Sequence, residues 1–172
     1  MGIPLYFRHL VNNFDDILTS NKQLKSCDNL YLDLNCGIHY CCREIIKDGY
    51  NKNKKDIIEK KMIENIISYI NLLLKYSNPQ KMLFIAIDGP APKSKMNQQR
   101  LRRFKTFYER KEHKKIEQQN NVNKEEKDVW DTNAITPGTE FMDKLGKTLQ
   151  NIRNYIDNKN LKIILSDSNV PG

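Results

Sequence analysis

The sequence predicts an α/β fold built on a mainly parallel, doubly wound sheet with helices on both faces. Three short apolar runs, at residues 30–32, 82–87 and 162–165, have the length and composition of buried strands, and a polar residue follows each of them. Segments rich in helix-forming residues fill the intervals between these runs. Because strands and helices alternate, we expect parallel strands joined by right-handed crossovers. A chain of 172 residues fits one domain.

The first strand is followed by Asp33 and then by a helical crossover, which we expect over residues 38–76. Eight apolar residues recur there at helical spacing: Ile57, Ile58, Met62, Ile66, Ile67, Ile70, Leu73 and Leu74. The crossover returns the chain to a second parallel strand, which Asp88 follows. Ligands bind at the carboxyl ends of the strands in such sheets, so Asp33 and Asp88 are expected at a functional edge.

The interval between the second and third strands contains a basic helix-forming stretch, a polar patch at residues 120–128 and a last helix. We expect this helix over about residues 138–156, since Pro137 and Gly138 are good helix starters. The sequence stops soon after the third strand, which predicts a sheet without its closing edge and an incomplete domain. Two lysine- and asparagine-rich stretches are expected to be solvated loops or helix ends: residues 51–55 and 118–127.

The charge of the chain points toward a polyanionic partner. The net charge is +8, with a pI near 9.2, and residues 93–105 contain six basic residues and no acidic ones. No apolar run approaches the roughly 20 residues that span a bilayer, and the first residues lack the apolar core of a signal peptide. We therefore expect an intracellular protein with no membrane partner.

Four cysteines lie in the first quarter of the chain, at Cys27, Cys36, Cys41 and Cys42. They lack the spaced arrangement of a secreted disulfide domain, so reduced thiols are expected. A zinc site formed by Cys36, His39, Cys41 and Cys42 is the alternative, although no distant second pair of ligands accompanies it.

Asp33 and Asn35 leave the end of the first strand together, and hard divalent cations favour such oxygen ligands. Asp88 would face Asp33 if the first two strands are neighbours. Two converging carboxylates repel each other, and a shared metal ion relieves that repulsion. The alternative for Asp33 is a turn residue or helix cap.

Lys95, Gln99, Arg102 and Arg103 stand at positions i, i+4, i+7 and i+8, which gathers them within about 100° of a helix surface. This group suits a terminal phosphate, which accepts charge-assisted and bidentate hydrogen bonds. The alternative is a solvated charged face. His39 could stack on a nucleobase or contact phosphate, or it could be a structural histidine.

Five blocks of residues, in order along the chain, carry a family resemblance. They are Met1-Gly2-Ile3-Pro4 with Phe7-Arg8; Leu32-Asp33-Leu34-Asn35 with His39; Ile87-Asp88-Gly89 followed by Ala91-Pro92-Lys93-Ser94-Lys95-Met96-Asn97-Gln98-Gln99-Arg100; Thr132-Asn133-Ala134-Ile135-Thr136-Pro137-Gly138-Thr139-Glu140-Phe141-Met142; and Val170-Pro171-Gly172. These blocks resemble the Xrn-type 5′-to-3′ exoribonucleases, and their joint specificity is high.

The resemblance implies the amino-terminal portion, residues 1–172, of a nuclease core of the PIN or flap-nuclease type. Such an enzyme binds single-stranded RNA with a 5′-monophosphate and hydrolyses its first phosphodiester with Mg²⁺, or Mn²⁺ as a substitute. The roles carried over by motif are 5′-phosphate binding by Lys95, Gln99, Arg102 and Arg103, metal binding and catalysis by Asp33 and Asp88, and contact with the first nucleotide by Asn35 and His39.

Two departures from the family pattern matter. Cys36-Gly37 stands where the family has a small residue followed by a β-branched one, which predicts altered packing near Asp33. The family's next metal-binding carboxylates come from a Glu-Gly-Glu-His run directly after Val-Pro-Gly, and this sequence stops at Gly172. We therefore expect these 172 residues alone to be inactive.

Two other functions fit parts of the same pattern. The first is a non-catalytic module that binds RNA 5′ ends and lacks a complete metal site. The second is a phosphohydrolase of the haloacid dehalogenase type, which also has an Asp after its first strand. That chemistry needs a second Asp two residues later, where this chain has Asn35.

Overall fold

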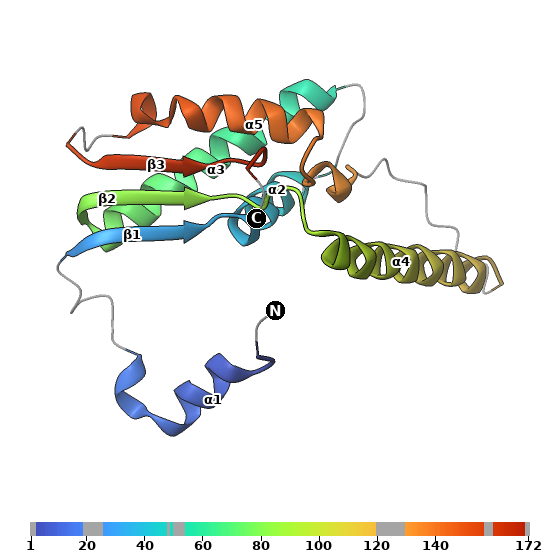
Figure 1. The fold of residues 1–172 in the computed structure, drawn as a ribbon. Helices are drawn as coiled ribbons and strands as arrows, with labels where there is room; N and C mark the ends of the chain where they lie inside the picture. Colours follow the sequence, from blue (N-terminus) through green and yellow to red (C-terminus); the bar gives the residue numbers. More distant parts are fainter. Residues whose placement is uncertain are drawn as a thin grey trace.

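A computed structural model describes residues 3–18, 26–47, 49, 54–119, 130–156 and 160–170. Its centre is a parallel sheet of three strands in the order β1 (Cys27–Asp33), β2 (Pro79–Ala86) and β3 (Lys162–Ser166). Figure 1 shows the three strands side by side and pointing the same way. The α/β class with a parallel sheet is thereby confirmed.

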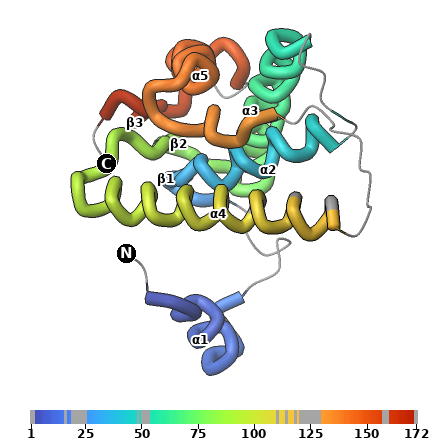
Figure 2. The backbone as a smooth tube through the Cα atoms, turned by 90° about the vertical axis from the view of Figure 1, so that its right-hand side faces the viewer, coloured from blue at the N-terminus to red at the C-terminus, as the bar shows by residue number. Residues whose placement is uncertain are grey.

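Three helices with buried residues pack on this sheet: α2 (Asn35–Ile46), α3 (Lys55–Ser77) and α5 (Glu140–Gln150). The single crossover predicted over residues 38–76 is thus two helices. The strand order advances in one direction, so right-handed crossovers place all three helices on the same face of the sheet. Figure 2 shows α2 and α3 together on that side.

The two faces of the sheet differ in burial. Leu83 and Ile85 point toward the helices and are 0% exposed, and they form the centre of the core. Because side chains alternate along a strand, Tyr31 and Phe84 lie on the opposite face. Tyr31 is 64% exposed, with its ring 5.9 Å from that of Phe84. Among the described residues, the buried helices lie on one face rather than on both.

Gly37 lies at a close contact between α2 and α3. A Cβ atom added to Gly37 would lie 2.8 Å from Cε1 of Tyr69 on α3, so the Tyr69 ring would have to shift to admit a side chain at this position. Asn65 Nδ2 donates a hydrogen bond to the Cys41 carbonyl across the same interface, at 3.1 Å. Gly37 therefore fits α2 tightly against α3 directly beneath the end of β1.

Helix α5 begins later than Pro137 and Gly138 predict. Gly138 has a left-handed φ of 85°, which is incompatible with a right-handed helix, and Thr139 is the N-cap. The Thr139 hydroxyl accepts a hydrogen bond from the Met142 amide at 3.4 Å. The helix also ends earlier than predicted, at Gln150, and a short 3-10 segment, η4 (Ile152–Tyr155), follows it.

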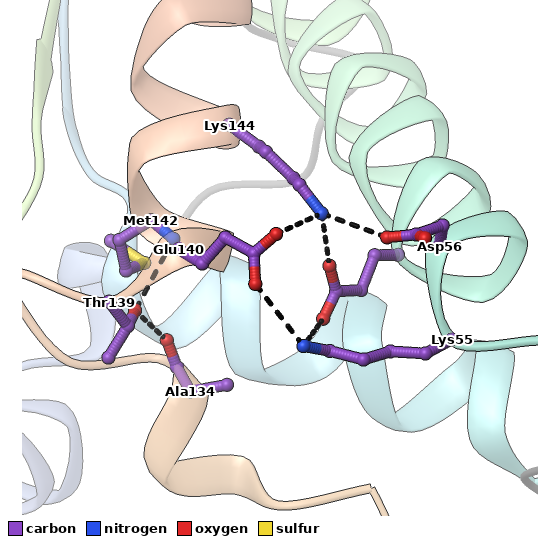
Figure 3. Close-up of polar contacts among 8 residues, drawn as sticks. Lys55, Asp56, Ala134, Thr139, Glu140, Met142 and Lys144 are labelled. Carbon is purple, nitrogen blue, oxygen red and sulfur yellow. Dashed lines mark hydrogen bonds and ion pairs between the residues drawn. The ribbon is translucent and has the colours of Figure 1, made fainter. Parts of the chain in front are cut away.

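An ionic cluster joins α5 to α3, and Figure 3 shows Lys55, Glu140 and Lys144 within it. At its centre is Glu59, which is 1% exposed. Lys144 Nζ lies 3.1 Å from Glu59 Oε2, 3.0 Å from Asp56 Oδ1 and 3.0 Å from Glu140 Oε1. Lys55 Nζ lies 3.4 Å from Glu140 Oε2 and 3.7 Å from Glu59 Oε1. A buried carboxylate with two cations beside it fixes the first turns of α5 on α3.

Two helices lie outside this packed layer. The basic stretch forms α4 (Lys93–Gln119), a helix of 27 residues whose described side chains are all at least partly exposed. Figure 1 shows it beyond the carboxyl ends of the strands. Near the amino terminus, α1 (Tyr6–Asn13) has no buried residue, and η1 (Asp15–Ile17) follows it.

Some expectations cannot be compared with the structure. The polar patch at residues 120–128 and much of the two lysine- and asparagine-rich stretches lie outside the described residues. In the part of the chain that is described, no helix combines the length and hydrophobicity needed to cross a membrane.

Candidate functional site

The carboxyl ends of the three strands are level with one another. Asp33 is in register with Ala86, the Leu34 amide donates to the Ala86 carbonyl, and the Ile87 amide donates to the Ser166 carbonyl, both at 2.9 Å. Asp88 is two residues beyond Ala86, so alternation gives Asp33 and Asp88 the same face of the sheet. The two carboxylates that the sequence singles out therefore share one edge and one face.

A third aspartate at this edge, Asp167, has the opposite orientation. It follows Ser166, which is in register with Ala86, so alternation turns it toward the helices. Asp167 Oδ2 accepts a hydrogen bond from Gln150 Nε2 of α5 at 3.3 Å, and Oδ1 accepts one from the Asn169 amide at 2.9 Å. Its hydrogen bonds give Asp167 a structural role.

A cavity of about 560 Å³ opens at the same edge, between α2, α4 and the loop at residues 135–138. Seven of the eight residues predicted from the sequence line it: Asn35, His39, Asp88, Lys95, Gln99, Arg102 and Arg103. Asp33 is not among its lining residues. Asp33 is exposed at the strand end, with Oδ1 3.4 Å from the Asn35 amide, a contact of the turn type considered as its alternative role.

The cavity is strongly cationic. The four α4 residues grouped by helical spacing all face it, while Asp88 is the one acidic side chain among the described residues that line it. Arg103 Nη2 also donates to the Thr136 hydroxyl across the cavity rim, at 3.2 Å. Guanidinium and ammonium groups that converge with an amide match the several acceptor oxygens of a phosphate group.

His39 lies on α2 and lines the cavity together with Asp88 and Arg102. Partial burial lowers the pKa of His39 below its ordinary value, and the nearby charges of Arg43 and Arg102 lower it further. The lowered pKa favours a neutral imidazole at neutral pH. The flat imidazole ring can stack against a base.

The side chains at this edge include oxygen donors of the kind that hard divalent cations favour. Asp33, Asp88 and Asn35 offer oxygen ligands, and Mg²⁺ commonly accepts few carboxylates while it keeps several waters. The described residues contain no cluster of three or more His, Cys, Asp or Glu side chains that could hold a metal ion. Two carboxylates are too few for a pair of metal ions. The Asn35 Nδ2 group is buried without a hydrogen-bond partner, which leaves a donor ready for an incoming oxygen atom.

The cysteines are not gathered into a metal site. Cys36 is exposed, whereas Cys41 and Cys42 are buried, and within the described ranges no metal-binding group includes them. Burial is the main cause that raises the pKa of Cys41 to about 11 and that of Cys42 to about 12. These two thiols therefore stay protonated inside the α2–α3 interface.

The structure adds residues that the sequence did not single out for the site. Thr136 contacts Arg103, and Ser168, which is 5% exposed, lines the cavity with Asn169. Thr136 belongs to one of the five blocks, but nothing in the local pattern marks it, because an isolated loop hydroxyl has no periodicity. Its relation to Arg103 depends on two segments that are 33 residues apart.

Comparison with known proteins gives a consistent result. Residues 1–172 match the family model described as "XRN 5'-3' exonuclease N-terminus". The chain is 40% identical to 5′-3′ exoribonuclease 1 of Saccharomyces cerevisiae, 35% identical to 5′-3′ exoribonuclease 2 of Schizosaccharomyces pombe and 36% identical to 5′-3′ exoribonuclease 2 of Gallus gallus. Each match covers 100% of this chain but only 12%, 21% and 21% of the respective relative.

Proposed function

Since the chain belongs to the XRN 5′-3′ exonuclease family, we propose that it is the part of a 5′-to-3′ exoribonuclease that binds the 5′-monophosphorylated end of single-stranded RNA. The observation that carries the proposal is one cavity lined by Lys95, Gln99, Arg102 and Arg103 together with Asp88. The cationic groups would attract a 5′-phosphate, whereas a neutral 5′-hydroxyl end would gain little from them. Because Asp88 lines the same cavity, the proposal assigns the adjoining phosphodiester to its neighbourhood.

The cavity residues would contact different parts of the RNA end. Arg102 and Arg103 hold the terminal phosphate through bidentate hydrogen bonds, and Lys95 and Gln99 complete its contacts. His39, neutral because of its lowered pKa, stacks on the first base, and the free amide donor of Asn35 contacts the same nucleotide. Together these contacts fix the first phosphodiester relative to the sheet edge.

Asp33 and Asp88 would hold Mg²⁺, or Mn²⁺ in its place, at this edge. The cation, when bound, would neutralise charge on the scissile phosphate and favour deprotonation of a water molecule. The geometry that this chain contributes is the level ending of β1 and β2, which sets both carboxylates on one face. These two carboxylates suit a single ion, so complete catalysis would need further ligands.

A direct experiment compares binding with cleavage. The protein is mixed with one RNA sequence that carries either a 5′-phosphate or a 5′-hydroxyl, with and without Mg²⁺. The proposal expects tighter binding of the phosphorylated RNA, and equal affinity for the two RNAs would overturn it. Mg²⁺-dependent release of mononucleotides would show that these residues are catalytically sufficient. Tight binding without release would favour the non-catalytic end-binding module.

A further inference from the structure

We propose that Thr136 determines which phosphorylated RNA 5′ ends can bind. It holds the Arg103 side chain behind the terminal phosphate, so that the pocket accepts a single phosphate group. This inference rests on the proposed function and gives it a specificity. Thr136 lies in a loop, and the family motifs assign it no role.

The contact between Arg103 and Thr136 joins two separate segments. Arg103 Nη2, on α4, donates to Thr136 Oγ1, on the loop before α5, at 3.2 Å. Both residues line the cavity of about 560 Å³ and also a second cavity of about 330 Å³ further along α4. Three more residues line both cavities: His39, Arg102 and Ile135. The Arg103–Thr136 pair therefore belongs to the partition, which is the set of residues that the two cavities share.

The second compartment would accept a longer phosphate chain on charge grounds. It is lined by Arg102 and Arg103 together with hydroxyl and amide side chains from Thr106, Thr132 and Asn133, and no acidic side chain is among its described lining residues. Added phosphate groups would increase attraction to the same guanidinium groups. Charge alone would thus favour a triphosphate end over a monophosphate end. The proposal therefore assigns a preference for the monophosphate to the partition that contains Arg103 and Thr136.

Thr136 is anchored to the core. The Thr139 hydroxyl, which caps α5, lies 2.9 Å from the Thr136 carbonyl. The first turns of α5 are in turn fixed on α3 by the ion pairs of Lys144 with Glu59 and Asp56 (Figure 3). The position of the Thr136 hydroxyl therefore follows that of the packed helices. A well-positioned acceptor gives Arg103 one preferred orientation.

The test measures affinity for one RNA sequence with a 5′-hydroxyl, a 5′-monophosphate or a 5′-triphosphate. The wild-type protein should bind the monophosphate form tightest. Thr136→Val removes the hydroxyl but keeps the volume, and it should reduce the preference for monophosphate over triphosphate by about three- to tenfold, the worth of one hydrogen bond. Thr136→Ala also widens the partition and should reduce the preference further. Thr136→Ser keeps the hydroxyl and should retain the wild-type preference.

The matched control is Thr148→Val, since Thr148 lies on α5 with its hydroxyl bonded to the Lys144 carbonyl at 2.9 Å, away from both cavities. It should leave the preference unchanged. If wild-type protein binds hydroxyl and monophosphate ends equally, the proposed function itself fails. If it distinguishes those two ends but Thr136→Val and Thr136→Ala keep the wild-type preference against triphosphate, only the role of Thr136 fails. Loss of the folded state in both variants would assign Thr136 to folding and would also overturn the inference.

Discussion

Lys144 on α5 lies within 3.1 Å of the carboxylate of Glu59 on α3, and Glu59 is only 1% exposed. Hydrogen bonds with Glu140, Asp56 and Glu59 raise the pKa of Lys144 and keep it charged. This ion pair connects α5, which follows the loop at residues 135–138, to α3, which packs on the sheet. The stability of the protein should therefore depend on it.

Replacement of Lys144 with Met should lower the free energy of unfolding by about 1–3 kcal/mol, because it leaves a buried carboxylate with one less cation. Urea denaturation measures this change. Lys147→Met is the control on the same helix, since Lys147 forms an exposed pair with Asp143 at 2.7 Å and should contribute less than about 0.5 kcal/mol. Equal losses in the two variants would show that burial of Glu59 has no special effect.

Arg102→Ala and Arg103→Ala should weaken binding of 5′-phosphorylated RNA by about 10- to 100-fold, because each removes hydrogen bonds to a charged group. Binding of 5′-hydroxyl RNA should change much less. Lys105→Ala provides a control of the same charge, since Lys105 pairs with Glu109 on α4 at 3.9 Å and does not line the cavity. A uniform loss on both RNAs would mean that the arginines act only through general charge.

Asp33→Asn and Asp88→Asn should each weaken Mn²⁺ binding, which is measured by electron paramagnetic resonance or calorimetry. Asp167→Asn should leave it unchanged, because Asp167 bonds to Gln150 and Asn169. In protein that cleaves RNA, Asp88→Ala should abolish cleavage and spare RNA binding. Turnover of the Asp88→Ala variant in saturating Mg²⁺ would contradict a metal-binding role.

The protonation of His39 should report on the cationic pocket. Burial, Arg43 and Arg102 all lower its pKa, so an NMR titration should place the midpoint below the ordinary value of 6.5. Arg43→Ala and Arg102→Ala should each raise the midpoint, with the larger rise for Arg43. The pKa of His39 is lower in the folded protein than in the unfolded chain. Its contribution to the free energy of unfolding is therefore fully present above the unfolded-state pKa and is lost as the pH falls through the folded-state pKa. A midpoint at or above 6.5 would show that His39 does not experience these charges.

Thiol modification should separate the cysteines. Cys36 is exposed, so iodoacetamide should alkylate it readily at pH near 8, as read by peptide mass spectrometry. Cys41 and Cys42 should react only on unfolding, because they are buried and their pKa values are raised to about 11 and about 12. Fast modification of Cys42 in folded protein would contradict its position in the α2–α3 interface.

Local sequence patterns determined a large part of this protein. The three apolar runs predicted the three strands within a few residues, because the strand side chains that pack against the helices, such as Leu83 and Ile85, are apolar. The spacing of Lys95, Gln99, Arg102 and Arg103 predicted a common face, and all four line one cavity. The α/β class and the family followed from the same kind of local information. Helix periodicity and motif blocks are properties of contiguous residues.

Only the tertiary structure decided how distant segments meet. The start of α5 depends on the Thr139 hydroxyl and on the left-handed Gly138. The position of Asp33 outside the cavity depends on the turn from β1 into α2. The contact between Arg103 and Thr136 joins residues that are 33 positions apart. The burial of Glu59 likewise needs a lysine 85 residues away. Such contacts arise from the packing of whole helices and strands. Local patterns in the sequence do not determine the relative positions of these elements.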